Sequence, residues 1–174
     1  MKSLNLSGCF EITDVSALFG LDTLSLSHCT GVRDVSALGR LRQLNLGACT
    51  SLRDLSALGG VQILDLSHCT GVRDVSALGA VKELTLSECT GSDGRECAGR
   101  RAHTEPGYCL VRDVSALGTV HTLNLTRCPA VVGVSALGGV HTLRLGSCDL
   151  VADVSALGGV TDLDLSFSAP ECVT

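Results

Sequence analysis

The pentapeptide Asp-Val-Ser-Ala-Leu recurs along the chain with a period of 20 residues that is broken once. Exact copies begin at Asp14, Asp34, Asp74, Asp113 and Asp153, and near-copies begin at Asp54 (Leu for Val) and Gly133 (Gly for Asp). A fixed period of this length is typical of a solenoid, because each unit is too short to bury its own apolar face and must stack on its neighbours. The repeat therefore predicts the architecture well. It says little about the ligand, which a solenoid contacts through variable surface positions.

One repeat, residues 41–60, shows the local structure to expect. Leu44 and Leu46 alternate with polar residues, which is the period of a short strand with one buried face. Cys49 follows three residues later, where the chain must turn a corner. The recurring Asp and Ser can cap a short helical or 3₁₀ turn, and the glycine after them suits its exit. Each repeat is predicted to consist of a strand, a corner, a short turn and a segment that leads back to the next strand.

These residues resemble the leucine-rich repeat, L-x-x-L-x-L-x-x-N/C-x-L. The stretch V-x-D-V-S-A-L is similar to the D-I-S-x-L part of internalin-like repeats, although the unit is shorter and Cys stands where Asn is usual. The resemblance covers nearly the whole chain outside residues 92–110. It implies an α/β repeat solenoid, a right-handed superhelix with a parallel sheet on the concave face and short turns or 3₁₀ segments on the convex side. It also implies a binding module, without a particular partner.

Seven of the ten cysteines occupy the same corner of successive repeats, which argues against a disulfide scaffold. In a leucine-rich repeat this corner points inward, so we expect these side chains to be buried and reduced, as small apolar groups with a weak donor. Neighbouring thiols would point the same way rather than at each other. Reduced thiols predict a cytoplasmic or otherwise intracellular protein. The seven are Cys9, Cys29, Cys49, Cys69, Cys89, Cys128 and Cys148.

Composition excludes several classes of ligand. The chain has 174 residues and a formal net charge of −5, which suits one soluble domain and disfavours nucleic acid, a ligand that needs a basic stripe. No apolar run is long enough for a membrane helix, and no secretory signal precedes the first repeat. The pairs His28-Cys29 and His68-Cys69 could suggest a metal, but the His should face the surface while the Cys faces the core. We therefore predict no metal and no other cofactor.

The pattern fails between Gly91 and Val111, where residues 92–110 lack the Leu-x-Leu signature. Permitted codons for residues 91–106, read from the second base, give GVTDVSALGAVHTLSL, a consensus repeat. We interpret the segment as a leucine-rich repeat translated out of frame. Its charged residues would fall on core positions, where they cannot be buried cheaply; they are Arg95, Arg100, Arg101 and Glu105.

The broken repeat divides the chain into three parts. We expect leucine-rich repeats over residues 1–91, an irregular loop over 92–110 and further leucine-rich repeats over 111–174. If the loop leaves the stack, the strand at 84–86 lies directly beside the strand at 123–125. A segment that loops out destabilises the fold only through the entropy of closing the loop. A segment that fills a place in the stack without forming a rung would lose a whole interface between neighbouring repeats, which is the larger cost.

The face of the predicted sheet offers the binding positions. Two rows of mostly small polar residues flank the buried leucine of each strand, and they are nearly free of the aromatic residues that dominate interface hot spots. A merely solvated face is one interpretation of these rows. They stop being uniformly small at Asp65, Glu83, His121 and Arg144, which are the predicted protein-binding residues.

Three functions stay open at this point. The first is a non-catalytic module that binds an unidentified protein through the concave face. The second is a recently expanded or decaying array with no selected ligand, which the near-identical repeats favour. The third is an enzyme, disfavoured because every recurring Ser and Asp has a structural role in the turn. Neither end carries a polar cap, so open strand edges also predict self-association.

Overall fold

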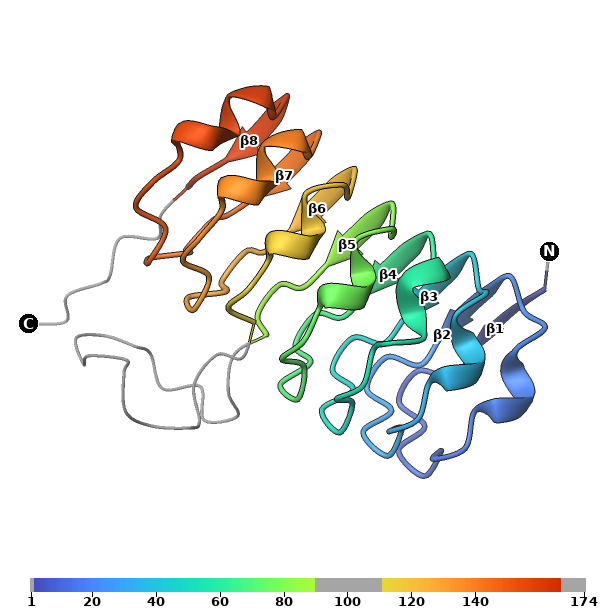
Figure 1. Cartoon of the computed structure of the whole chain (residues 1–174). Coiled ribbons are helices and arrows are strands. Elements are labelled where there is room, and N and C mark those ends of the chain that lie inside the picture. The colour runs from blue at the N-terminus through green and yellow to red at the C-terminus, as the bar shows by residue number, and fades with distance from the viewer. Residues whose placement is uncertain (1, 90–110, 167–174) are drawn as a thin grey trace, which may run out of the picture.

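The computed structural model describes residues 2–89 and 111–166, which form eight stacked repeats, here called rungs. Each rung contributes one strand to a single parallel sheet, and the strands lie side by side in sequence order (Figure 1). The strands are β1 (Ser3–Asn5), β2 (Thr23–Ser25), β3 (Gln43–Asn45), β4 (Ile63–Asp65), β5 (Glu83–Thr85), β6 (Thr122–Asn124), β7 (Thr142–Arg144) and β8 (Asp162–Asp164). The predicted repeat solenoid is confirmed.

Each strand is shorter than the sequence suggested. It is centred on the first leucine of the Leu-x-Leu pair, and the second leucine follows the strand. The main-chain hydrogen bonds nevertheless continue: the Leu26 amide donates to Asn45 at 2.8 Å, and the His28 amide donates to Gly47 at 2.7 Å. The corner residue three positions after the strand has a left-handed backbone, which a regular strand does not contain. This residue is Gly8, His28, Ala48, His68, Glu88, Arg127 or Ser147 in successive rungs.

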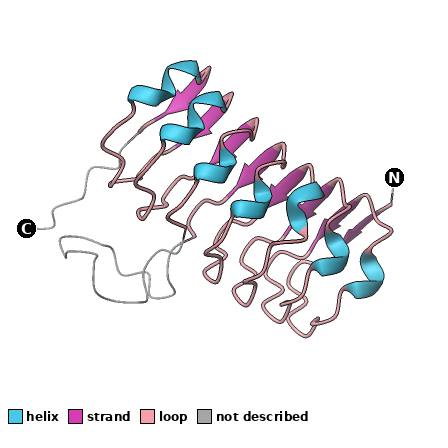
Figure 2. Ribbon diagram, in the orientation of Figure 1, coloured by secondary structure: helices cyan, strands magenta, loops and turns pink. Residues whose placement is uncertain are grey.

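The opposite side of the solenoid carries short 3₁₀ helices, set in a row across from the strands (Figure 2). They are η1 (Ser16–Leu18), η2 (Ser36–Leu38), η3 (Leu58–Gly60), η4 (Ser76–Leu78), η5 (Ser115–Leu117), η6 (Ser135–Gly139) and η7 (Ser155–Gly159). The recurring Asp holds this turn, as predicted: Asp34 Oδ1 accepts the Ser36 amide at 2.9 Å. The same bond forms in five other rungs. Hydrogen bonds from the serine lower the pKa of each Asp below its ordinary value: the hydroxyl contributes most at Asp74, Asp113 and Asp153 and the amide contributes most in the other three rungs.

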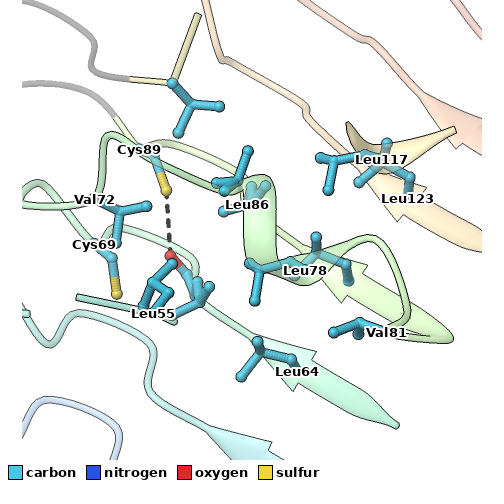
Figure 3. Packing of buried hydrophobic residues seen from close by; sticks show 14 of the residues in the cluster. Leu55, Leu64, Cys69, Val72, Leu78, Val81, Leu86, Cys89, Leu117 and Leu123 are labelled. Carbon is cyan, nitrogen blue, oxygen red and sulfur yellow. Dashed lines mark hydrogen bonds between the residues drawn. The ribbon is translucent and has the colours of Figure 1, made fainter. Parts of the chain in front are cut away.

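The core lies between the sheet and the helices and consists of Leu, Val and Cys columns (Figure 3). Among the described residues no polar or charged side chain is buried. An inner rung is sealed by both neighbours, so Leu44 is 1% exposed and Leu46 is 0% exposed. The outer rungs have one neighbour each. Leu4 is therefore only partly buried, and Leu163 is 37% exposed.

The fifth and sixth rungs stack directly, although nearly two repeat periods of sequence separate their strands. Leu84 of β5 pairs with Leu123 of β6 in the same register as every other pair of neighbours. The predicted contact between these two strands is confirmed. The loop expected over 92–110 lies outside the described residues.

The cysteine prediction is correct for six positions and wrong for Cys9. Each buried thiol donates to the main-chain oxygen of a leucine in the rung before it, at 3.0–3.2 Å. Cys9 belongs to the first described rung and, within the described residues, no rung covers it from the preceding side, so its side chain is exposed. No disulfide joins any two of the seven described cysteines.

Candidate protein-binding face

The residues that flank the central leucine of each strand point away from the core, because successive side chains in a strand alternate between faces. In the inner strands the leucine is buried, whereas nearly all the flanking residues are partly exposed. We call this surface the sheet face and the side with the 3₁₀ helices the turn face. The leading row of the sheet face is Ser3, Thr23, Gln43, Ile63, Glu83, Thr122, Thr142 and Asp162. The trailing row is Asn5, Ser25, Asn45, Asp65, Thr85, Asn124, Arg144 and Asp164.

The four predicted binding residues belong to four neighbouring rungs. Asp65 ends β4, Glu83 begins β5, His121 directly precedes β6, and Arg144 ends β7. At the usual strand spacing these rungs extend over about 14 Å. The four do not form one cluster, however. Glu83 and His121 lie at the leading ends of their strands, whereas Asp65 and Arg144 lie at the trailing ends.

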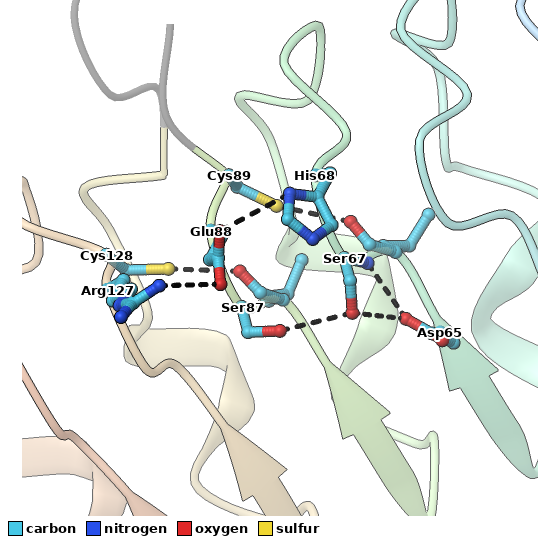
Figure 4. Close-up of polar contacts among 10 residues, drawn as sticks. Asp65, Ser67, His68, Ser87, Glu88, Cys89, Arg127 and Cys128 are labelled. Carbon is cyan, nitrogen blue, oxygen red and sulfur yellow. Dashed lines mark hydrogen bonds and ion pairs between the residues drawn. The ribbon is translucent and has the colours of Figure 1, made fainter. Parts of the chain in front are cut away.

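Asp65 has a structural role that the sequence analysis missed. Its Oδ1 accepts the Ser67 amide at 2.9 Å and the Ser67 hydroxyl at 2.5 Å (Figure 4). The side chains of Asn5, Asn45, Asn124 and Asp164 accept the equivalent amide in their own rungs. A recurring Asn or Asp two residues before a Ser, Gly or Thr was the available signal, since such side chains form Asx turns.

Arg144 interrupts that pattern and pairs across the sheet instead. Its guanidinium lies 2.7 Å from Asp162 Oδ2 on the neighbouring strand β8. The pKa of Asp164 is also lowered, first by the hydrogen bonds from Ser166 and then by the charge of Arg144. The positive charge of Arg144 therefore lies among acidic side chains. The sequence carried a signal for this arrangement, because both acidic residues follow Arg144 by about one repeat period and so belong to the next rung.

His121 stacks on a second imidazole, that of His141. The ring centroids are 4.7 Å apart and the planes are tilted by 38°. His141 Nδ1 lies 3.4 Å from Thr142 Oγ1, in a contact that orients the second ring. Glu83 is partly buried and, within residues 2–89 and 111–166, forms no ion pair.

An ion-pair row that the sequence analysis did not find runs along the corner residues. Glu88 Oε1 lies 3.1 Å from the guanidinium of Arg127, and Glu88 Oε2 lies 3.5 Å from His68 Nδ1 (Figure 4). These three residues are exposed or nearly so, and exposed pairs contribute little to stability. Glu88 and Arg127 are 39 residues apart in sequence, so only the direct stacking of the two rungs brings them together.

Comparison with solved structures decides the fold. Internalin C2 of Listeria monocytogenes superposes with a TM-score of 0.59 at 20% identity, over 90% of this chain and 67% of that one. The fold is that of a leucine-rich-repeat solenoid. A second Listeria monocytogenes internalin (inlF) gives a TM-score of 0.51 at 20% identity, over 97% of this chain and 56% of that one. No protein-family model and no curated protein sequence matches the chain. None of the helices that the structure describes has the length and apolar content to cross a membrane.

Proposed function

We propose that the protein is a non-catalytic interaction module that binds a partner protein through its sheet face. The observation that carries the proposal is the unbroken sheet of eight parallel strands, with two rows of mostly exposed or partly exposed polar side chains on its outer surface. Stacked repeats of this kind present an extended rigid platform. The direct pairing of β5 with β6 keeps that platform continuous.

The recurring polar groups support a role without catalysis. In six rungs the Asp that precedes Ser-Ala-Leu accepts a serine amide, as Asp74 does from Ser76. The trailing-row Asn or Asp accepts the amide that follows the strand, as Asn45 does from Gly47. These side chains hold the backbone in its turns, so they are committed to structure. The proposal includes an intracellular location, which the buried, reduced state of Cys29, Cys49 and Cys69 favours.

Contact residues in this proposal are Asp65, Glu83, His121 and Arg144, and the structure suggests how to test them. Asp65→Lys would remove the turn acceptor together with the charge. Asp65→Asn removes only the charge, because Asn5, Asn45 and Asn124 already perform the same turn. Arg144→Asn likewise installs a side chain that this row carries at Asn5, Asn45 and Asn124. The double variant D65N/R144N therefore changes the charges of the sheet face with little effect on the fold.

The experiment pans a displayed protein-fragment library against the immobilised chain and retests each selected clone against the variants. Clones that bind the wild type and lose at least tenfold in affinity for D65N/R144N or for Glu83→Gln support the proposal. The control is R33Q/R53Q/R73Q, which changes three exposed side chains of the turn face. Clones that lose affinity only for this control place the binding surface on the turn face and refute the proposal.

The outer rungs support a second mode of binding, self-association. Val154 is 41% exposed and Leu163 is 37% exposed, although equivalent residues of the inner rungs are buried. A second copy stacked there would cover them and pair its strand with β8. Sedimentation velocity at increasing concentration should show association that Leu163→Lys abolishes. A monomer at every concentration would exclude this mode and leave the sheet-face proposal untouched.

A further inference from the structure

Two imidazoles from successive rungs lie side by side at the leading edge of the sheet. The rings of His121 and His141 have their centroids 4.7 Å apart. Both side chains are exposed. Their backbones are fixed to each other, because the amides of His141 and Thr142 both donate to the His121 carbonyl at 3.0 Å. The two rings are therefore held as close neighbours by the sheet itself.

In place of the expectation of no metal, which considered only the His-Cys pairs, we propose that His121 and His141 form a site for a divalent transition-metal ion that favours imidazole ligands, such as Ni²⁺. A metal–nitrogen bond of about 2.1 Å requires the two nitrogens to lie roughly 3 Å apart. Rings stacked on adjacent strands reach that separation by rotating their side chains, with no movement of the backbone. The contact of His141 Nδ1 with Thr142 Oγ1 leaves Nε2 of that ring as the ligand.

The site is open. No third His, Cys, Asp or Glu joins the pair within the described residues, so water completes the coordination. The neighbouring rungs carry Lys82 before β5 and Thr161 before β8 in the same row, and both side chains are exposed. Neither is a good ligand, which limits the protein's contribution to two nitrogens. Hard ions such as Mg²⁺ and Ca²⁺ prefer oxygen ligands and should not bind here.

The second histidine supplies most of the affinity through effective concentration. Once one imidazole holds the ion, the other closes the chelate as an intramolecular step. Linked ligands of this kind gain about 10²-fold over single ones. Loss of either ring should therefore be nearly as damaging as loss of both. This behaviour separates a chelate from two independent surface histidines, whose removal would have additive effects.

Isothermal titration of the full chain with NiCl₂ tests the proposal. Nickel is preferred to zinc as the probe, because thiolates bind zinc well. The expected result is one site, weakened at least tenfold in His121→Ala and equally in His141→Ala. The matched control is H28A/H68A/H103A, which removes the other histidines of the sequence and should bind with wild-type affinity. No saturable binding by the wild type, or unchanged binding by His121→Ala, would overturn the proposal.

A structural readout guards against misfolding of the variants. Circular dichroism of His121→Ala should match the wild type, because the imidazole is exposed and its removal leaves the core intact. His121→Asn gives a second variant with a polar side chain of similar size. If both keep the native spectrum and both lose nickel, the effect belongs to the metal ligand.

Discussion

The thiol of Cys128 donates to the main-chain oxygen of Leu86 at 3.0 Å across 42 residues of sequence. In the other five rungs the same bond spans 23 residues. The difference between the two spans equals the length of the segment 92–110. The bond is otherwise of ordinary length, so rungs five and six fit together as if this segment were not there.

Deletion of residues 92–110 should therefore leave the solenoid intact. The junction joins Gly91 to Val111 and produces CTGVRDVSALG, which is identical to residues 69–79. Removing a loop of this length saves closure entropy on the order of 2–3 kcal/mol, so urea denaturation should show equal or greater stability. As a control, deletion of the equally long segment 53–71 shifts the repeat out of register and should unfold the protein. A less stable 92–110 deletion would mean that the segment packs on the rungs.

Gly133 offers a test of the aspartate turn. It occupies the place of the recurring Asp, its backbone φ is ordinary, and a Cβ there would meet nothing within 4 Å. Gly133→Asp should restore the bond to the Ser135 amide and stabilise the protein by about 1–2 kcal/mol. Gly133→Ala, which changes the backbone entropy alone, should give the smaller part of that gain. Equal midpoints of thermal unfolding for the two variants would show that the carboxylate adds nothing.

The glycine after each Ser-Ala-Leu allows neighbouring rungs to approach. A Cβ on Gly138 would lie 2.4 Å from the Ala156 carbonyl oxygen of the next rung, whereas one on Gly158 would meet nothing within 4 Å. Gly138→Ala should therefore destabilise the fold by about 1–3 kcal/mol through overpacking. Gly158→Ala should be neutral or slightly stabilising. The first rung has Phe19 instead of glycine at this position although a rung follows it, and the Phe19 side chain is 67% exposed. The same loss of stability in both variants would refute this account.

The buried thiols predict a loss of stability in alkali. Burial raises the pKa of Cys49 to about 12 and also raises the pKa of Cys29 and Cys69. In the unfolded chain thiols ionise near pH 8.5. Above that pH the folded state holds more protons than the unfolded state, so the free energy of unfolding falls as pH rises and is at its full value below it. Denaturant midpoints at pH 7, 9 and 10.5 should show this fall.

Two serine variants check the origin of the alkaline effect. Cys49→Ser keeps a donor for the Leu26 oxygen but does not titrate in this range, so its midpoint should fall less steeply with pH. Cys9→Ser changes an exposed thiol and should follow the wild type. A fall equally steep in Cys49→Ser would trace the alkaline loss to other groups.

The sequence by itself determined the local structure of one rung. The regular period, the Leu-x-Leu alternation and the Asp before nearly every Ser-Ala-Leu depend on contacts that the repeats make in the same way, so a single repeat contains the information. For the same reason the direct stacking of β5 on β6 could be predicted: the pattern resumes in register at Val111.

Only the tertiary structure decided what happens between particular rungs. Cys9 is exposed because burial of this corner depends on a preceding rung, which the repeat motif does not encode. The pairing of Glu88 with Arg127 depends on which variable residues happen to meet across the stack, over 39 residues of sequence. Side chains at these positions are free of the repeat's constraints, so their contacts follow from geometry and charge in three dimensions.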